Sequence, residues 1–429
     1  MKKSLLLGAA AMAAVVAAAP QAEASEVTVG GYYMIRFQDN DLVMNQTTAA
    51  GDTGAWNQRA QINITAKMSE KTSFHINTRF FDDQMAGGSY TQANNPTTAY
   101  TMDVMQTWLE TEMYGVGVKV GSMPFNMHDQ LLYKDSGGSL DAIMLSKSFG
   151  GITVLLGDIK ALDPAASDGA TGVGNENDAT DHYLGSVLGK AGSVNYQVTY
   201  VHQDSGDQAT TYTANTDNNW VAATLGTNLG GVKMTLTGIW ESGLNGTGVV
   251  AGSQLEESGG YGALKVSGKT GFGGWNGYGF YSSEDYNHPL YQGGGGGHAP
   301  GFSTAWDQGG VAGRDLLQDF WTGATNANNN ATQMENVWGV GLGLTVKAGA
   351  WTIKPQVDYA ALVEDNVGGA ALAASDDVWA GSLVATTKLD AGTTFSLIAI
   401  GATPGENGTQ TAETVTDMHS LQAEFKVKF

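Results

Sequence analysis

The sequence predicts an all-β fold: a transmembrane, antiparallel, up-and-down β-barrel of 18 strands, with 16 strands as the alternative count. Three observations lead to this prediction. Segments of about ten residues alternate apolar and polar side chains along most of the chain. Short turns and longer polar loops alternate between these segments. The last segment ends the chain at an aromatic residue, Phe429.

The alternating segments define the expected strands. In segment 194–200, for example, Val194, Tyr196 and Val198 alternate with polar side chains, as a wall between lipid and a watery lumen requires. The expected strands are 26–38, 56–68, 72–83, 102–113, 116–123, 138–148, 151–161, 181–190, 193–203, 218–228, 231–242, 260–269, 275–284, 336–347, 350–361, 377–388, 393–402 and 417–429. Pro355 fits its strand worst, because proline lacks the backbone N–H that pairs with a neighbouring strand.

The connections predict the orientation of the barrel. Short turns are expected near 69–71, 114–115, 149–150, 190–192, 229–230, 270–274, 347–349 and 390–392. Longer polar loops are expected near 39–55, 84–101, 124–137, 162–180, 204–217, 243–259, 285–335, 362–376 and 403–416. This asymmetry is typical of a barrel with short periplasmic turns, long extracellular loops and both termini in the periplasm. The longest loop, 285–335, could fold into the mouth, lie across a neighbouring subunit or be partly disordered.

Both ends of the chain fit an exported outer-membrane protein of a Gram-negative cell. Lys2 and Lys3 precede an apolar run over 5–19 and a small-x-small cleavage site at 22–24, which together predict a signal peptide over 1–24. The barrel is then expected over 25–429. The alternating segment 421–429 resembles the C-terminal signal that outer-membrane proteins present to the barrel assembly machinery, so Phe429 is the expected assembly signal.

Composition excludes several functions. The chain has no cysteine, which excludes disulfide bonds, thiolate metal sites and covalent attachment of c-type haem to this chain. A net charge of −21 disfavours nucleic acid as a partner and favours cations. The 60 glycines, 16 tyrosines and 10 tryptophans suit many strands, turns and aromatic belts.

Arginine is rare and its placement is informative. The chain has Arg36, Arg59, Arg79 and Arg314, and the first three fall on the polar face of the first three expected strands. They are therefore expected to line one wall of the lumen. With carboxylates opposite, they would set up a transverse field that selects solutes. The alternative is that each arginine pairs with a nearby carboxylate and only braces the barrel.

Five carboxylates are candidates for the acidic side of this constriction. Glu110 and Glu112 lie on the polar face of the fourth strand, and Asp129, Asp135 and Asp141 surround the third long loop. We expect all five to line the pore.

The region around that loop resembles bacterial porins. Segments 116–125 and 140–145 are similar to the strand–loop–strand core of the homotrimeric porins of sulfate- and metal-reducing bacteria and of alginate-export-like barrels. The chain departs from that core at Ser122, where those proteins often carry arginine, and at 140–142, where they carry Phe-Asp-Gly. The resemblance implies an inward-folded third loop, a homotrimer in outer-membrane lipid, and small hydrophilic solutes as partners.

No catalytic, metal or cofactor motif is found. The seven histidines are scattered, no Gly-x-Ser-x-Gly elbow occurs, and Asp181 with His182 supplies too few metal ligands. We expect no enzyme activity. The sequence favours a passive diffusion channel for small hydrophilic solutes or ions, with a modest cation preference from acidic loops. The alternative is a barrel that sheathes a periplasmic multihaem cytochrome, whose haem would belong to the partner.

Overall fold

The computed structural model describes residues 26–41, 53–85, 102–133, 140–162, 180–205, 218–244, 256–283, 337–363, 377–404 and 418–429. The predicted signal peptide 1–24 and the loop 285–335 lie outside these described residues, so both stay predictions. No helix in the described ranges is long and apolar enough to cross a membrane.

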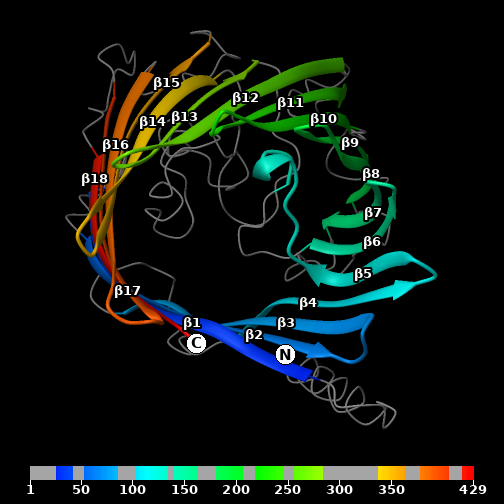
Figure 1. Cartoon of the computed structure of the whole chain (residues 1–429), viewed down its shortest axis with the longest axis horizontal. Helices are drawn as coiled ribbons and strands as arrows, with labels where there is room; N and C mark the ends of the chain where they lie inside the picture. The colour runs from blue at the N-terminus through cyan, green and yellow to red at the C-terminus, as the bar shows by residue number, and fades with distance from the viewer. Residues whose placement is uncertain are drawn as a thin grey trace, which may run out of the picture.

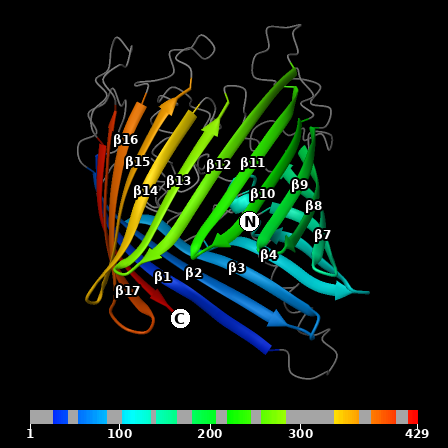
Figure 2. The ribbon, with the colours of Figure 1, turned by 45° about the horizontal axis from the view of Figure 1, so that its top comes forward.

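The described strands form one closed antiparallel barrel (Figures 1 and 2). The strands are β1 (Glu26–Asp41), β2 (Thr53–Lys67), β3 (Thr72–Met85), β4 (Met102–Met113), β5 (Val116–Met123), β6 (Leu140–Phe149), β7 (Ile152–Leu162), β8 (Thr180–Ala191), β9 (Val194–Ser205), β10 (Asn218–Leu229), β11 (Val232–Leu244), β12 (Glu256–Thr270), β13 (Gly273–Ser282), β14 (Val337–Ala348), β15 (Trp351–Leu362), β16 (Asp377–Lys388), β17 (Thr393–Pro404) and β18 (Met418–Lys428). Each pairs with its neighbours in sequence, and β1 closes on β18. The predicted 18-stranded barrel is confirmed, and the 16-strand alternative is wrong.

Alternation divides each strand between two environments. Large apolar residues on one parity are exposed on the outer face, as a lipid-facing wall requires. Aromatic residues on this face gather toward the ends of strands that lead into the long loops: Tyr183, Tyr200, Trp240, Tyr281, Trp338 and Trp379. The other parity faces the lumen and carries most of the charged side chains of the strands.

The closing seam joins Phe429 to Gly31. The Gly31 amide donates to the Phe429 carbonyl oxygen at 3.0 Å, and the Phe429 amide donates to the Gly31 carbonyl oxygen at 3.2 Å. A Cβ at position 31 would overlap the Gln61 carbonyl oxygen and come within 3.0 Å of the Phe429 ring. Only glycine therefore fits where the last side chain crosses the first strand.

Pro355 occupies a strand without disrupting the barrel. Its register pairing to Leu383 of β16 is intact, but pairing between β14 and β15 is interrupted between Gly343 and Val346. The missing proline donor falls on the interrupted side, so only one ladder is weakened.

Candidate channel constriction

Several lumen-facing residues of β7 to β11 are large and apolar. Ile159, Val201, Trp220 and Ile239 point inward, and each is at most 4% exposed. Inward-facing apolar side chains in a water-filled barrel need a cover. This wall is called the covered wall below.

Part of that cover is the segment of residues 124–133, which follows β5 and carries the short 3₁₀-helix η1 (His128–Gln130). Figure 1 shows η1 inside the ring of strands, on the side of β10. Leu132 and Tyr133 of this segment are at most 1% exposed and belong to one apolar cluster with the covered wall. Burying side chains of this size stabilises the arrangement by roughly 1.5–3 kcal/mol each. The resemblance-based expectation that the third loop folds inward agrees with this placement.

His128 joins the segment to two strands. Its Nε2 is hydrogen-bonded to Thr199 Oγ1 of β9 at 2.6 Å, and its Nδ1 to Thr224 Oγ1 of β10 at 2.9 Å. The Thr199 hydroxyl is also hydrogen-bonded to the Ser186 hydroxyl of β8, and the Thr224 hydroxyl to the Thr237 hydroxyl of β11. Together these bonds form one hydrogen-bonded chain across four strands. Burial lowers the pKa of His128 to about 4, so at pH 7 one ring nitrogen donates and the other accepts.

Two further polar contacts hold the segment. Asp129 Oδ2 lies 2.6 Å from Lys265 Nζ of β12. The Tyr133 hydroxyl is hydrogen-bonded to His182 Nδ1 of β8 at 3.0 Å. His128 and Asp129 both have left-handed backbone angles, with φ of 51° and 61°, at a cost of roughly 1–2 kcal/mol per residue. The side-chain contacts and the buried apolar residues offset this cost.

The wall opposite η1 in the ring is formed by β18, β1, β2 and β3. Arg36, Arg59, Arg79 and Lys426 face the lumen here, as the strand parity predicts for the arginines. These four residues are called the basic wall below. The Lys426 ammonium lies 4.1 Å from the centre of the Tyr32 ring.

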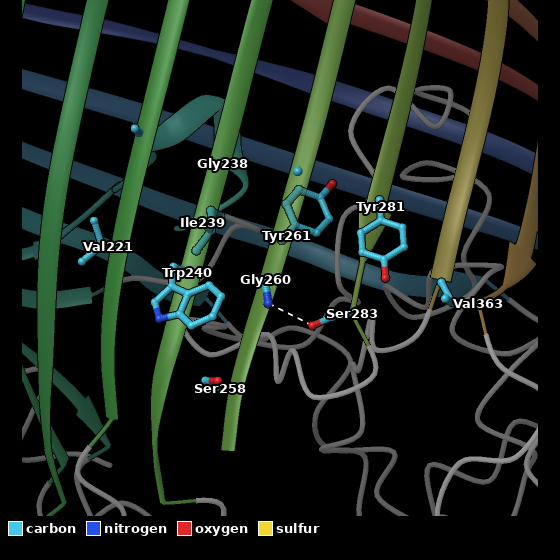
Figure 3. A pocket seen from close by; sticks show the side chains of 12 residues that line it. Val221, Gly238, Ile239, Trp240, Ser258, Gly260, Tyr261, Tyr281, Ser283 and Val363 are labelled. Atoms are coloured by element: carbon cyan, nitrogen blue, oxygen red, sulfur yellow. Dashed lines mark hydrogen bonds between the residues drawn. The ribbon is translucent and has the colours of Figure 1, made fainter. Parts of the chain in front are cut away.

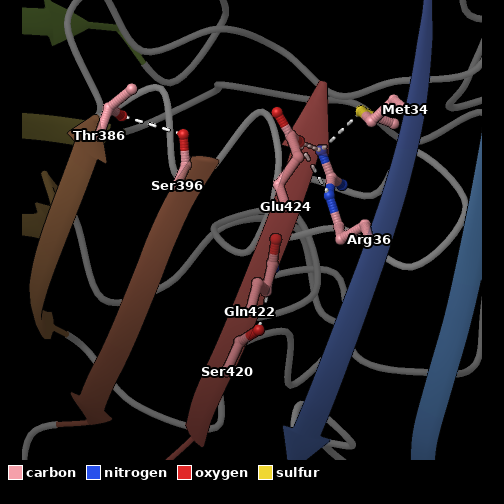
Figure 4. Close-up of polar contacts among 7 residues, drawn as sticks. All are labelled: Met34, Arg36, Thr386, Ser396, Ser420, Gln422 and Glu424. Carbon is pink, nitrogen blue, oxygen red and sulfur yellow. Dashed lines mark hydrogen bonds and ion pairs between the residues drawn. The ribbon is translucent and has the colours of Figure 1, made fainter. Parts of the chain in front are cut away.

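Arg36 is paired with a carboxylate that the sequence did not suggest. Its Nη2 lies 2.9 Å from Glu424 Oε2, and its Nε donates to the same oxygen at 3.3 Å (Figure 4). The cross-strand row continues through Ser396 to Thr386, whose hydroxyls are hydrogen-bonded at 3.0 Å. Arg36 therefore has the nearby carboxylate partner that the bracing alternative expects.

Arg59 and Arg79 continue the wall diagonally. Arg59 is level with Met34 of β1, two residues along the strand from Arg36. Arg79 is level with Gln61 of β2, two residues along the strand from Arg59. The register partners on the next strand are Asp82 and Asp103, whose side chains lie outside the described part of the structure.

Glu110 and Glu112 face the lumen, but they do not face the arginines. Glu110 Oε2 lies 3.1 Å from Lys119 Nζ. Glu112 Oε1 lies 2.6 Å from the Nζ of Lys71, which belongs to a short turn. Both carboxylates are close to the periplasmic end of β4, whereas the arginines lie farther up their strands. Parity thus places both carboxylates on the lumen face but does not fix their height, and their role in a constriction stays a prediction.

The three aspartates predicted around the third long loop differ in where they lie. Asp129 is at the inward segment, as expected, and Asp135 lies outside the described residues. Asp141 is on the outer face, with the same parity as Ile143 and Leu145. It is level with Lys160 of β7, which pairs with Asp181 of β8 at 2.6 Å. The expectation that Asp141 lines the pore is therefore wrong.

A groove of about 710 Å³ is separate from the channel. It lies on the outer face between Trp240 and Tyr281, over a floor that includes Gly238, Gly260 and Gly262 (Figure 3). Ser283 accepts a hydrogen bond from the Gly260 amide at 2.9 Å at one edge. The groove opens toward the lipid side, so it contributes nothing to a constriction.

Sequence reasoning missed His128, Thr199, Thr224 and Lys265. The inward parity of Thr199 and Lys265 was available as a signal, but their contacts join the segment 124–133 to strands far along the chain. Across the described ranges, no three His, Asp or Glu side chains gather closely enough to hold a metal ion.

No family model and no curated protein matches this chain. Solved structures do. The chain is similar to a BenF-like porin from Pseudomonas fluorescens Pf-5, with a TM-score of 0.61, 11% identity and coverage of 94% of this chain and 98% of that one. The fold is that of an outer-membrane porin. The outer membrane protein opdK from Pseudomonas aeruginosa is also similar, with a TM-score of 0.59, 9% identity and coverage of 94% and 98%. OccAB4 from Acinetobacter baumannii gives a TM-score of 0.57, 10% identity and coverage of 95% and 99%. At these identities the likeness concerns the porin fold, and the expected resemblance to porins of sulfate- and metal-reducing bacteria stays a prediction.

Proposed function

We propose that this protein is a passive diffusion channel of the Gram-negative outer membrane for small hydrophilic solutes. The observation that supports it best is the segment 124–133, which is fixed to one inner wall and leaves a charged wall opposite. An exposed apolar outer face and a polar inner face suit a barrel in lipid with water inside. We expect no catalysed reaction.

At the described strand positions, basic side chains that face the lumen outnumber acidic ones, which supports a preference for anions. Basic side chains at described lumen-facing strand positions are Arg36, Arg59, Lys67, Arg79, Lys119, Lys190, Lys233, Lys265, Lys269, Lys347, Lys354, Lys388, Lys426 and Lys428. Acidic side chains at such positions are Glu26, Glu110, Glu112, Glu241, Asp358 and Glu424. The cation preference expected from the sequence depended on loop carboxylates, most of which lie outside the described residues. A charged constriction inside low-dielectric walls acts on permeating ions more strongly than a screened mouth does.

Reversal potentials across planar bilayers test this function. The wild-type protein should form stable single channels that prefer chloride to potassium at about 0.1 M salt, where the Debye length is about 10 Å. Arg59→Ala and Arg79→Ala should each shift the preference toward cations by about twofold, because a unit charge is lost near the permeating ion. Lys147→Ala, on the outer face of β6, is the matched control and should change nothing.

A channel that prefers cations at this salt concentration would mean that the acidic loops, and not the lumen wall, control the ion preference. Unchanged selectivity with loss of barrel stability would instead mean that Arg59 and Arg79 are structural braces. Absence of channels would contradict the function itself.

The cytochrome sheath finds no specific support. A sheath needs an open lumen, and the segment 124–133 occupies part of it beside the covered wall. Homotrimeric assembly, which the family resemblance implies, remains a prediction for this chain, as does recognition of Phe429 by the barrel assembly machinery.

A further inference from the structure

The contact between Asp129 and Lys265 sits at the lumen edge of the segment 124–133. The Asp129 side chain is 43% exposed and that of Lys265 is 33% exposed, so water and ions reach both. Lys265 belongs to β12, on the far side of the lumen from the basic wall. Without a partner it would add a second positive surface opposite the first.

The backbone places Asp129 for this contact. Position 129 is left-handed, a conformation that is uncommon outside glycine but that aspartate adopts more readily than most residues, and it directly follows another left-handed residue. His128 is 1% exposed and fixed between Thr199 and Thr224, so the turn cannot relax without breaking those hydrogen bonds. The strained turn thus directs the carboxylate of its second residue toward the β12 wall.

We propose that Asp129 is a specificity-determining residue of the channel: its carboxylate masks the charge of Lys265, and His128 is the positioning residue that holds it there. This inference rests on the proposed channel function. The lumen then has the basic wall on one side and a neutralised Lys265 on the other, and the ion preference depends on both members of the pair.

Single-channel recordings of paired variants test the masking. Asp129→Asn exposes the Lys265 charge and should raise the ratio of chloride to potassium permeability by about twofold at about 0.1 M KCl. Lys265→Met exposes the Asp129 charge and should lower the ratio by about the same factor. The double variant should return close to the wild-type ratio, since both charges are gone.

The outward-facing pair Lys160–Asp181 supplies the matched control. It has the same chemistry and the same N–O distance of 2.6 Å, but it faces away from the lumen. Asp181→Asn and Lys160→Met should leave the permeability ratio unchanged. Shifts of equal size in these controls would show a general effect of net charge and overturn the proposal.

His128 is tested by its effect on the Asp129 substitution. His128→Ala should raise conductance and open-channel noise, and in this background Asp129→Asn should shift selectivity less than it does in the wild type. His128→Gln, which keeps a donor and an acceptor, should largely restore wild-type conductance. All variants must show the wild-type heat-dependent mobility of a folded barrel.

The outcomes separate the two proposals. A wild-type protein that forms no channels overturns the channel function and this inference with it. Normal channels in which Asp129→Asn and Lys265→Met shift selectivity in the same direction, or not at all, overturn the masking alone. An undiminished Asp129→Asn shift in the His128→Ala background overturns the role of His128.

Discussion

The covered wall and the basic wall follow the same strand alternation but present opposite chemistry to the lumen. Inward positions of β7 to β11 include Ile159, Val201 and Trp220, whereas inward positions of β1 to β3 include Arg36, Arg59 and Arg79. The difference arises because the covered wall is buried beneath the segment 124–133. On the covered wall, apolar side chains at lumen-facing positions therefore mark where the segment 124–133 docks.

The two walls also differ in what stabilises them. The covered wall and its segment form a small apolar core inside the barrel, with His128 and Tyr133 supplying polar contacts. The basic wall has the Arg36–Glu424 pair, whose side chains are 13% and 12% exposed. Losing one member of a largely buried pair costs about 3–5 kcal/mol, because the other charge is left without compensation.

The largest expected effect is at the seam that completes the basic wall. Gly31→Val, or deletion of Phe429, should abolish most of the folded, heat-modifiable barrel, because β1 and β18 no longer meet in register. Export to the periplasm should be unaffected. Gel mobility before and after heating measures the folded fraction.

Gly238→Val is the control for the seam. Nothing lies within 4 Å of a Cβ at that outward-facing position, so the barrel should assemble normally. A normal yield of folded barrel for Gly31→Val would show that the seam tolerates a side chain.

An intermediate effect is expected from breaking the covered wall. Leu132 is 0% exposed, and Leu132→Asp would bury an unpaired carboxylate at a cost of several kcal/mol. The segment 124–133 should leave the wall, and mean single-channel conductance and noise should rise while the barrel stays folded. Leu132→Met, which conserves volume, should behave like the wild type. Unchanged conductance for Leu132→Asp would mean that the segment does not limit the channel.

The smallest effect is expected in a short turn remote from both walls. Asp390 accepts hydrogen bonds from the Gly392 amide at 2.8 Å and the Thr393 amide at 2.7 Å, and these lower the pKa of its carboxyl. The resulting stability is present above the ordinary carboxyl pKa and is lost as the pH falls through the lowered value. Asp390→Asn should therefore lower the unfolding temperature slightly at pH 7 and less near pH 3, without changing conductance. A decrease that grows on acidification would contradict this sign.

The strands were predictable because lipid and water impose alternation on every one of them. The segment expected at 231–242 is β11 (Val232–Leu244), and that expected at 393–402 is β17 (Thr393–Pro404). Parity also placed Arg36, Arg59 and Arg79 in the lumen. Parity also indicates that Asp141 faces outward, since Ile143 and Leu145 lie on the same face of the strand. The prediction that Asp141 lines the pore followed its closeness to the third loop instead.

The remaining features of the site are not local. Glu110 and Glu112 were placed on the correct face, but their height along β4 and their lysine partners depend on register with neighbouring strands. The contacts of His128 and Asp129 join a loop to strands about 70 to 140 residues away. No periodicity within a strand reports which loop will rest against it.

The outward-facing charges have a consequence for how the barrel sits in its membrane. On β14 the outer face is apolar from Trp338 to Val346, whereas on β7 it is apolar only from Ile152 to Leu156 before Asp158 and Lys160. At about 3.3 Å per residue, the apolar band beside β7 is shorter by roughly 13 Å along the strand. A flat bilayer of constant thickness cannot match both sides. Either the barrel axis tilts or the lipid thins beside β6 to β9, and both bring the polar headgroups down to the level of these charges on one side of the molecule.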